Sequence, residues 1–188
     1  MTAILVSGPV VEPLSLAEAK SWIKVDASDE DALIQSLIIS ARIAVEAATN
    51  RFLISQQWRL VMDAWPVGGS LALALTPVRS VSRIRTLDAA GVASDVPVAQ
   101  YSLDASLDHA RILLGPAVPT PGVATNGITI DLMVGYGDAT AVPEPFRLAI
   151  RRLVALWFAN RGDGDALATR MPTAVLALLA PYRIRRLA

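Results

Sequence analysis

The chain has 188 residues, with 17 basic and 17 acidic side chains and a formal net charge of zero, a balance that argues against a general nucleic-acid binder. Apolar residues make up 53% of the chain and charged residues 18%, which excludes a disordered protein. The mean hydropathy of +0.46 indicates surplus apolar surface. Because no segment reaches the roughly 18 uninterrupted apolar residues of a membrane-spanning helix, we expect other subunits to bury that surface, with no membrane partner.

The N-terminal part of the chain predicts a short first helix and the start of a second. Ser15 and Glu18 stand at capping-box spacing, and Leu14 occupies the staple position before them. The first helix should therefore run from this box to about Lys24. Ser28 is the expected N-cap of the second helix, because three carboxylates follow it and suit the positive end of a helix dipole.

The second helix is expected to continue to about Asn50. Its core face is predicted by apolar residues that repeat at helical spacing. These are Ile34, Leu37, Ile38, Ala41, Val45 and Ala48. Ile39 and Ile43 lie off this stripe, so the helix is apolar nearly all round and is expected to have more than one neighbour. We take Ile39 and Ile43 as candidate subunit-interface residues.

The middle of the chain changes to short apolar runs separated by Gly, Pro and Asp, which is typical of a small antiparallel sheet. The expected strands are 57–63, 71–75, 81–87, 101–103, 111–114 and 127–134. Residues 116–126 read as a flexible loop. Gly135-Tyr136-Gly137-Asp138 lacks the third glycine of a dinucleotide-binding loop. We interpret it as a tight turn that uses the positive φ angles open to glycine.

The last third returns to helical spacing. Pro143-Glu144-Pro145 predicts a helix start, and a short helix is expected over 173–180. Together the patterns predict an α+β fold: a small helical bundle, with two N-terminal and two C-terminal helices, and an inserted antiparallel β-subdomain. The expected organisation is a single domain over 1–180, helical over 14–52 and 143–180 with the β-subdomain over 55–137, followed by a basic tail over 181–188.

Candidate catalytic and metal-binding groups are few. The one histidine, His109, follows Asp108, and the chain has no cysteine. A zinc site would therefore need carboxylates for all its other ligands, and we interpret this pair as part of a polar loop. We expect no enzyme activity, no metal and no cofactor, although a small hydrolase using Asp108 and His109 is kept as an alternative.

The charges are distributed unevenly along the chain. Residues 1–66 carry eight acids and five bases, residues 67–146 carry seven acids and four bases, and residues 147–188 carry two acids and eight arginines. Arg147, Arg151 and Arg152 either solvate one face of the third helix or contribute to an interface, and Arg147 and Arg151 are taken as candidate subunit-interface residues. A small DNA-binding module that uses this Arg-rich C-terminal part is the alternative function.

The last residues of the chain interleave apolar and arginine side chains after Pro181, which suits docking on a partner protein; the alternative for such an end segment is disorder. The segment consists of Tyr182, Arg183, Ile184, Arg185, Arg186, Leu187 and Ala188.

Several motifs resemble, in order and spacing, the head–tail connector (adaptor) proteins of long-tailed phages and of phage-like gene transfer agents. The matching stretches are 13–20, 23–26, 31–34, 41–42, 45–47, 49–51, 57–58, 77–78, 135–138, 142–145, 147–150 and 178–183. Residues 88–126 resemble the family least. The resemblance implies helices around a small β-subdomain, as the residues themselves predict.

The resemblance also implies a non-enzymatic structural role. Members form a homo-oligomeric ring, commonly of 12 subunits, which is assembled in the bacterial cytoplasm and placed in the neck of the particle beneath the capsid portal. The C-terminal segment commonly reaches into the portal protein, so the portal-docking role is carried onto residues 182–188. The opposite face receives the next tail-side component, a stopper or tail terminator, and DNA passes through the central channel without being specifically bound.

Overall fold

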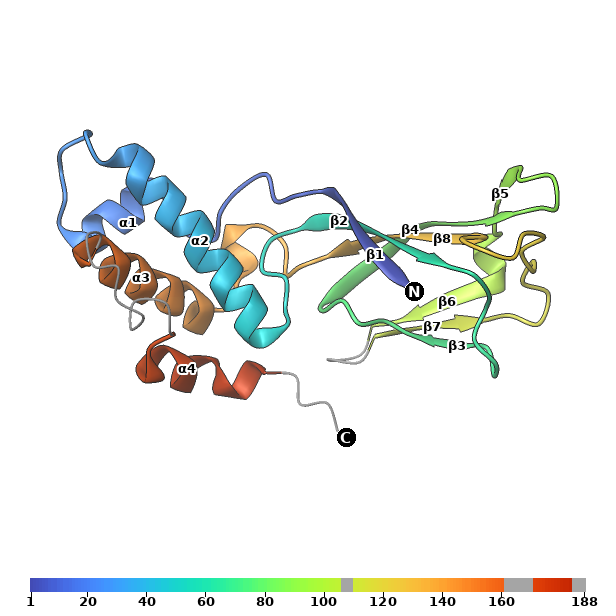
Figure 1. The fold of residues 1–188 in the computed structure, drawn as a ribbon. Coiled ribbons are helices and arrows are strands. Elements are labelled where there is room, and N and C mark those ends of the chain that lie inside the picture. Colours follow the sequence, from blue (N-terminus) through green and yellow to red (C-terminus); the bar gives the residue numbers. More distant parts are fainter. Residues whose placement is uncertain (106–109, 161–170, 184–188) are drawn as a thin grey trace. The chain divides into compact units, whose positions relative to one another are not determined.

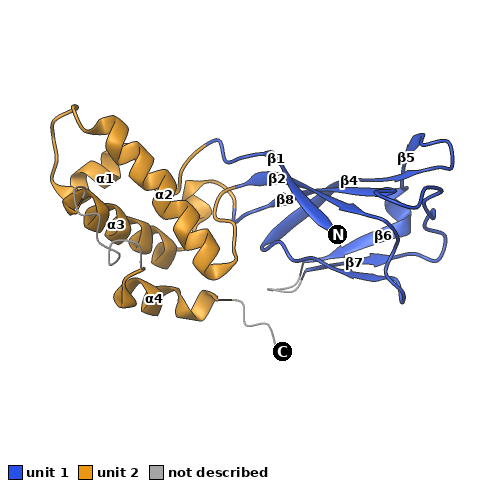
Figure 2. Cartoon of the chain, in the orientation of Figure 1, with its two compact units in different colours: residues 1–10, 55–136 blue, residues 11–54, 137–188 orange. Residues whose placement is uncertain are grey.

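A computed structural model of the chain describes residues 1–105, 110–160 and 171–183. The described chain divides into two units (Figure 2), a β-rich unit of Met1–Val10 and Ser55–Tyr136 and a helical unit of Val11–Ile54 and Gly137–Ala188. The chain thus passes three times from one unit to the other. The fold combines helices with antiparallel sheets, which confirms the predicted α+β class.

The described part of the helical unit contains four α-helices (Figure 1), and α2 packs against the other three. Their bounds are α1 Leu16–Ile23, α2 Asp31–Thr49, α3 Glu144–Ala159 and α4 Thr173–Leu179. Short 3₁₀ turns lie at η2 Ala139–Ala141 and η3 Ala180–Tyr182. The unit's core is built from side chains that are almost fully buried, among them Ile34, Ile38, Val45, Phe146, Ile150, Leu153, Val175 and Leu179.

The start of α1 follows the predicted capping box. The Ser15 hydroxyl accepts a hydrogen bond from the Glu18 backbone N–H at 3.2 Å, and the Glu18 carboxylate accepts one from the Ser15 N–H at 2.9 Å. Leu14, at the staple position, is buried. Lys20 on α1 then pairs with Asp31 at the first residue of α2, at 2.6 Å, which ties the two helices together.

The predicted cap of α2 is wrong. The helix begins at Asp31 with Glu30 as its N-cap, and no side chain caps it. The backbone carbonyl of Ser28 instead accepts a hydrogen bond from the Asp31 N–H at 3.1 Å. Ser28 therefore closes the turn that precedes the helix, and only Asp31 of the three carboxylates lies in the first helical turn.

The buried face of α2 differs in part from the predicted stripe. Four of the predicted residues are buried, but Leu37 and Ala48 are only half-buried, whereas Arg42 and Thr49 are buried. Within the described residues, α2 is the one helix with the length and hydropathy of a membrane span. Arg42, a buried charge on that helix, is paired with Glu12 and Glu46 within the same unit.

The β-rich unit holds two antiparallel sheets (Figure 1). The five-stranded sheet has the order β1-β2-β8-β4-β5, and the three-stranded sheet has the order β3-β7-β6. The strands are β1 Thr2–Ser7, β2 Gln56–Met62, β3 Ser70–Ala72, β4 Val78–Leu87, β5 Ala93–Asp95, β6 Tyr101–Asp104, β7 Arg111–Leu114 and β8 Ile128–Val134. The central strand β8 supplies four side chains with no exposed area: Ile128, Ile130, Leu132 and Val134.

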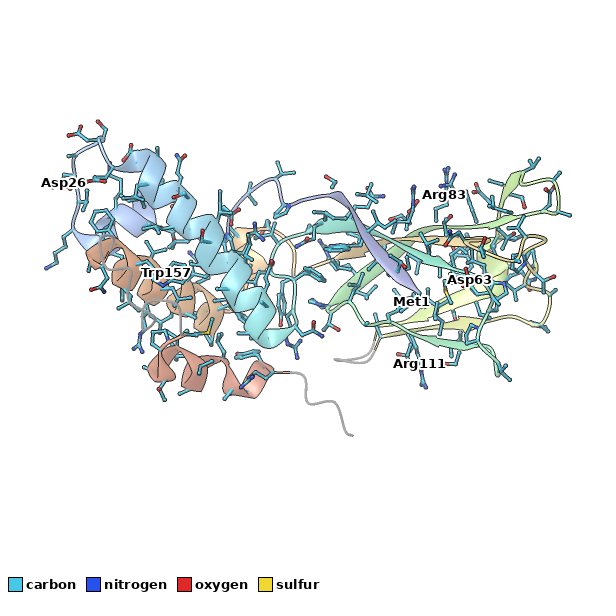
Figure 3. All side chains as sticks on the ribbon, in the orientation of Figure 1. Met1, Asp26, Asp63, Arg83, Arg111 and Trp157 are labelled. Atoms are coloured by element: carbon cyan, nitrogen blue, oxygen red, sulfur yellow. The ribbon has the colours of Figure 1, made fainter. Side chains whose placement is uncertain are left out.

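The outer face of the five-stranded sheet carries charged side chains instead. Arg59 on β2 donates two hydrogen bonds to Asp131 on β8, at 2.6 and 3.0 Å. The hydrogen bonds from Arg59 lower the pKa of Asp131, and the charges of Arg59, Arg85 and Arg83 lower it further. Arg83 on β4 and Arg111 on β7 project from opposite sides of the unit (Figure 3).

Two strands lie outside the sequence prediction, β1 and β5. Every residue of both strands is exposed. With no buried face, neither strand needs the alternation of apolar and polar residues by which a half-buried strand is predicted from sequence. The turn predicted after β8 is confirmed, because Gly135 and Gly137 have φ angles of 102° and 143°. The Asp138 carboxylate then accepts hydrogen bonds from the backbone N–H groups of Thr140 and Ala141, which caps η2.

Candidate functional site

The candidate site residues of the helical unit lie on α2, on α3 and at the end of η3. Ile39 and Ile43 are one turn apart on α2, with 42% and 54% of their area exposed. Ile39 lines a groove of about 510 Å³ with residues of the segment Val11–Glu18, other residues of α2 and Ala139. An exposed apolar pair beside a groove is a surface that a partner protein can cover.

Arg147 and Arg151 on α3 are engaged within the chain. Arg147 contacts the Glu18 carboxylate at the start of α1, and Arg151 binds Glu144 at 2.5 Å. The Ser15 backbone N–H lowers the pKa of Glu18 through its hydrogen bond, and the charges of both arginines add to this. These guanidinium groups are therefore held in fixed positions by carboxylates of the same unit, and each is mostly covered.

Arg151 also lies against an aromatic ring on α1. Its guanidinium carbon is 5.9 Å from the centre of the Trp22 ring, within the range of a cation–π contact. Trp22 is 47% exposed and borders a shallow hollow together with Glu18, Lys24 and Arg151. The α1–α3 face thus combines a fixed cation with an exposed tryptophan, a pair of residue types that is enriched at protein interfaces.

A buried ion network fixes the segment before α1 onto α2. Arg42 donates hydrogen bonds to Glu12 at 2.8 Å and to Glu46 at 2.9 Å, and Glu46 accepts another from the Leu53 N–H at 2.8 Å. Burial raises the pKa of Glu46 against the opposing effect of these donors. The network links α2 to the segment before α1, through Glu12, and to the segment that follows α2, through Leu53. Because Glu12 also lines the groove beside Ile39, the network fixes one wall of that groove.

The root of the C-terminal segment is attached to the helical unit. Arg51, which is buried, donates a hydrogen bond from Nε to the backbone carbonyl of Tyr182 at 2.6 Å. The Tyr182 ring packs on Phe146 of α3, with ring centres 4.6 Å apart and planes at 54°. Arg183 is the next residue and is exposed. The arrangement fixes where the segment leaves the unit.

Comparison with known proteins identifies the family. A family model described as phage gp6-like head–tail connector protein matches residues 13–73. A chain from the neck of an empty gene transfer agent (GTA) particle with C6 symmetry is 31% identical, with a TM-score of 0.83, covering all of this chain and 98% of that one. The chain belongs to the phage gp6-like head–tail connector family.

Two further GTA structures contain chains similar to this connector. One is from the virion of a native GTA particle, at 30% identity and a TM-score of 0.83, and the other is from the neck of a native GTA particle with C12 symmetry, at 30% identity and a TM-score of 0.80. Each match covers all of this chain and 98% of the other. No curated protein sequence gives a significant match to the connector.

The family has a structural role and is not an enzyme class. Asp108 and His109 lie outside the described residues, and so do Ile184, Arg185, Arg186, Leu187 and Ala188 of the expected docking segment. Within the part of the chain that the structure describes, no group of three or more His, Asp or Glu residues is placed to hold a metal ion.

The structure brings together some of the candidate residues of this connector and adds others. Arg147 and Arg151 share α3 and converge on carboxylates, while Ile39 and Ile43 form a separate apolar pair on α2. Sequence reasoning missed Arg51, whose partner is 131 positions away. Its only local signal is its place directly after the left-handed Asn50, which ends α2 but does not indicate what the arginine binds.

Proposed function

We propose that this connector forms a ring in the neck of a phage-like particle, between the capsid portal and the tail, with a central channel for DNA. The observation that carries this proposal is the full-length similarity to a GTA neck chain, at 31% identity and a TM-score of 0.83. A match over the whole chain supports a shared assembly role more strongly than a match of one motif. The C6 and C12 symmetries of those necks agree with a ring of 12 subunits.

The exposed apolar pair on α2 supports the proposed subunit contact. In a ring each subunit has two different neighbours, so the contact uses two different surfaces of the chain. Ile39 and Ile43 expose about half of their area and gain from burial by a neighbour. Arg147 and Arg151 are assigned to the interface as pre-positioned donors, because ordering them costs little side-chain entropy once carboxylates hold them.

The portal-docking role is proposed for Tyr182–Ala188, with different tasks along the segment. Tyr182 packs on Phe146 and accepts the hydrogen bond from Arg51, so it acts as the root. Arg183 and the residues after it supply the side chains for the portal protein. A fixed root favours binding, because it limits the orientations that the segment loses on docking.

The other expected partners follow from the same proposal. The face away from the portal receives the next tail-side component, a stopper or tail terminator, and DNA passes the channel without being specifically bound. The DNA-binding alternative receives less support, since the chain carries 17 basic and 17 acidic side chains and has a formal net charge of zero. It predicts duplex binding that weakens steeply with salt.

The proposal is tested by deleting the gene in the source organism and examining induced particles by negative-stain electron microscopy. Separate heads and tails are the expected result, and normal tailed particles would refute the proposal. Complementation with a chain lacking residues 184–188 tests docking while leaving Tyr182 and its contacts in place. Arg152→Ala, an exposed change on α3, is the matched control and should restore tailed particles.

A further inference from the structure

Strand β1 is an edge strand with little of the usual protection. All of its residues are exposed, and Ile4, Leu5 and Val6 expose 48%, 49% and 46% of their area. It pairs with β2 on one side and lies at the end of the five-stranded sheet (Figure 1). Thr2–Ser7 contains no charge and no proline, two of the features that normally keep an edge strand from pairing with another chain. Its one irregularity is a shift in the register with β2 between Leu5 and Ser7.

The other end of the same sheet has an incompletely covered edge. Strand β5 pairs with β4 only over Arg85–Leu87. On the side away from β8, no strand in the described part of the chain pairs with Val78–Arg83. Most of this stretch is exposed, and irregularities in its pairing with β8 lie on either side of Ser80 and Val81.

These two edges match in length and direction. β1 has six residues, and the open part of β4 runs from Val78 to Arg83, where the β5 pairing has not yet begun. Successive strands from β1 to β4 alternate in direction. A neighbour of nearly the same orientation, as in a ring with many subunits, would therefore present its β1 antiparallel to β4, like every other pair in this sheet.

We propose that β1 of one connector subunit pairs with the open edge of β4 in the next subunit, so that the sheet continues around the ring. The inference rests on the proposed ring and names one of its contacts. A cyclic ring needs two different surfaces on each chain, and the two ends of one sheet supply them. Strand addition satisfies free backbone groups of both edges and covers Ile4, Leu5 and Val6.

Cysteine cross-linking in assembled particles tests this pairing, because the chain has no cysteine of its own. Deletion cells are complemented with the wild-type chain, with Leu5→Cys alone, and with Leu5→Cys combined with Val78→Cys or Val81→Cys. The register places both valines on the face of the sheet that carries Leu5, opposite Val134 and Leu132 of β8. The two pairs allow for a two-residue shift in register. Purified particles are oxidised and probed with an antibody to the chain. Leu5→Cys with Val98→Cys is the matched control, because Val98 is exposed on the 3₁₀ turn η1 Val98–Gln100, outside both edges.

The expected result is a ladder of covalent multimers from one of the two edge pairs and at least ten-fold less from the control. Incorporation of all variants without such a ladder would overturn the pairing while the proposed function stands. Cross-linked dimers from Leu5→Cys alone would overturn it in favour of β1 pairing with itself, and a cross-link to another protein would assign the edge to that partner. Absence of the wild-type chain from particles would refute the proposed function, and the pairing with it.

A charge substitution gives an independent measurement. Leu5→Lys places a protective charge on the edge and is expected to lower the amount of chain per particle at least ten-fold, with an unchanged thermal unfolding midpoint of the purified subunit. Leu5→Val keeps an apolar strand former and serves as its control. Incorporation of the Leu5→Lys chain at the wild-type level would overturn the proposal.

Discussion

The contact between Arg51 and Tyr182 makes a direct prediction about the C-terminal segment. Arg51→Met keeps much of the side-chain volume but removes the charged donor that binds the Tyr182 carbonyl at 2.6 Å. A hydrogen bond to a charged group contributes about 1.5–3 kcal/mol. The packing of the Tyr182 ring on Phe146 is retained and continues to contribute about 1 kcal/mol. The loss of about 2 kcal/mol should weaken the attachment without unfolding the unit.

Hydrogen exchange measures this loss locally. A change of about 2 kcal/mol corresponds to about a 30-fold rise in the population of open states, so protection over η3 and the end of α4 should fall by about that factor. Portal binding should weaken as well, because the segment loses its fixed root. Arg152→Met, on the exposed side of α3, is the control. Unchanged protection in Arg51→Met would refute the argument that this hydrogen bond holds the root.

Four further predictions concern the stability and assembly of the connector. Arg42→Met leaves two partly buried carboxylates without their cation and should lower the free energy of unfolding by about 3 kcal/mol; a loss under about 1 kcal/mol in urea denaturation would contradict the role of the network. Ser15→Ala removes the α1 cap and should cost about 1 kcal/mol, measured in the same way. Asp131→Asn should cost about 1 kcal/mol at neutral pH. Because Arg59 lowers the pKa of Asp131 in the folded state, this contribution is present above about pH 4 and is lost as the pH falls through the lowered pKa, so wild type and variant should converge in acid; a constant difference would contradict the linkage. Ile43→Glu should leave the thermal midpoint of the isolated subunit unchanged but prevent its incorporation into particles, and normal incorporation would remove this residue from the interface.

The two N-terminal helices show which helix starts can be predicted from local sequence patterns and which cannot. The Ser15–Glu18 box predicts the start of α1 because both of its hydrogen bonds form within four residues of chain. The same reasoning places the N-cap of α2 at Ser28, two residues before the observed N-cap, Glu30. An acidic stretch offers several possible starts, and the contact of Lys20 with Asp31 is a tertiary interaction that local spacing does not contain.

Polar residues in the interior were the least predictable part of the site. Arg42 stands beside the core stripe of α2 and has no local mark of burial, yet it is 8% exposed because Glu12 and Glu46 compensate its charge. Arg147 and Arg151 were open to two interpretations in the sequence. Their partners Glu18 and Glu144 show that most of their charge is balanced within the chain.

The sequence by itself determined the helices, most of the strands, the glycine turn after β8 and the family, because capping, periodicity and turn chemistry act over a few residues. Only the tertiary structure decided that Thr2–Ser7 is a strand, that Arg51 holds Tyr182, and that the edges of β1 and β4 are open. Each of these depends on groups that are distant in the chain. Their energies arise only when folding brings those groups together.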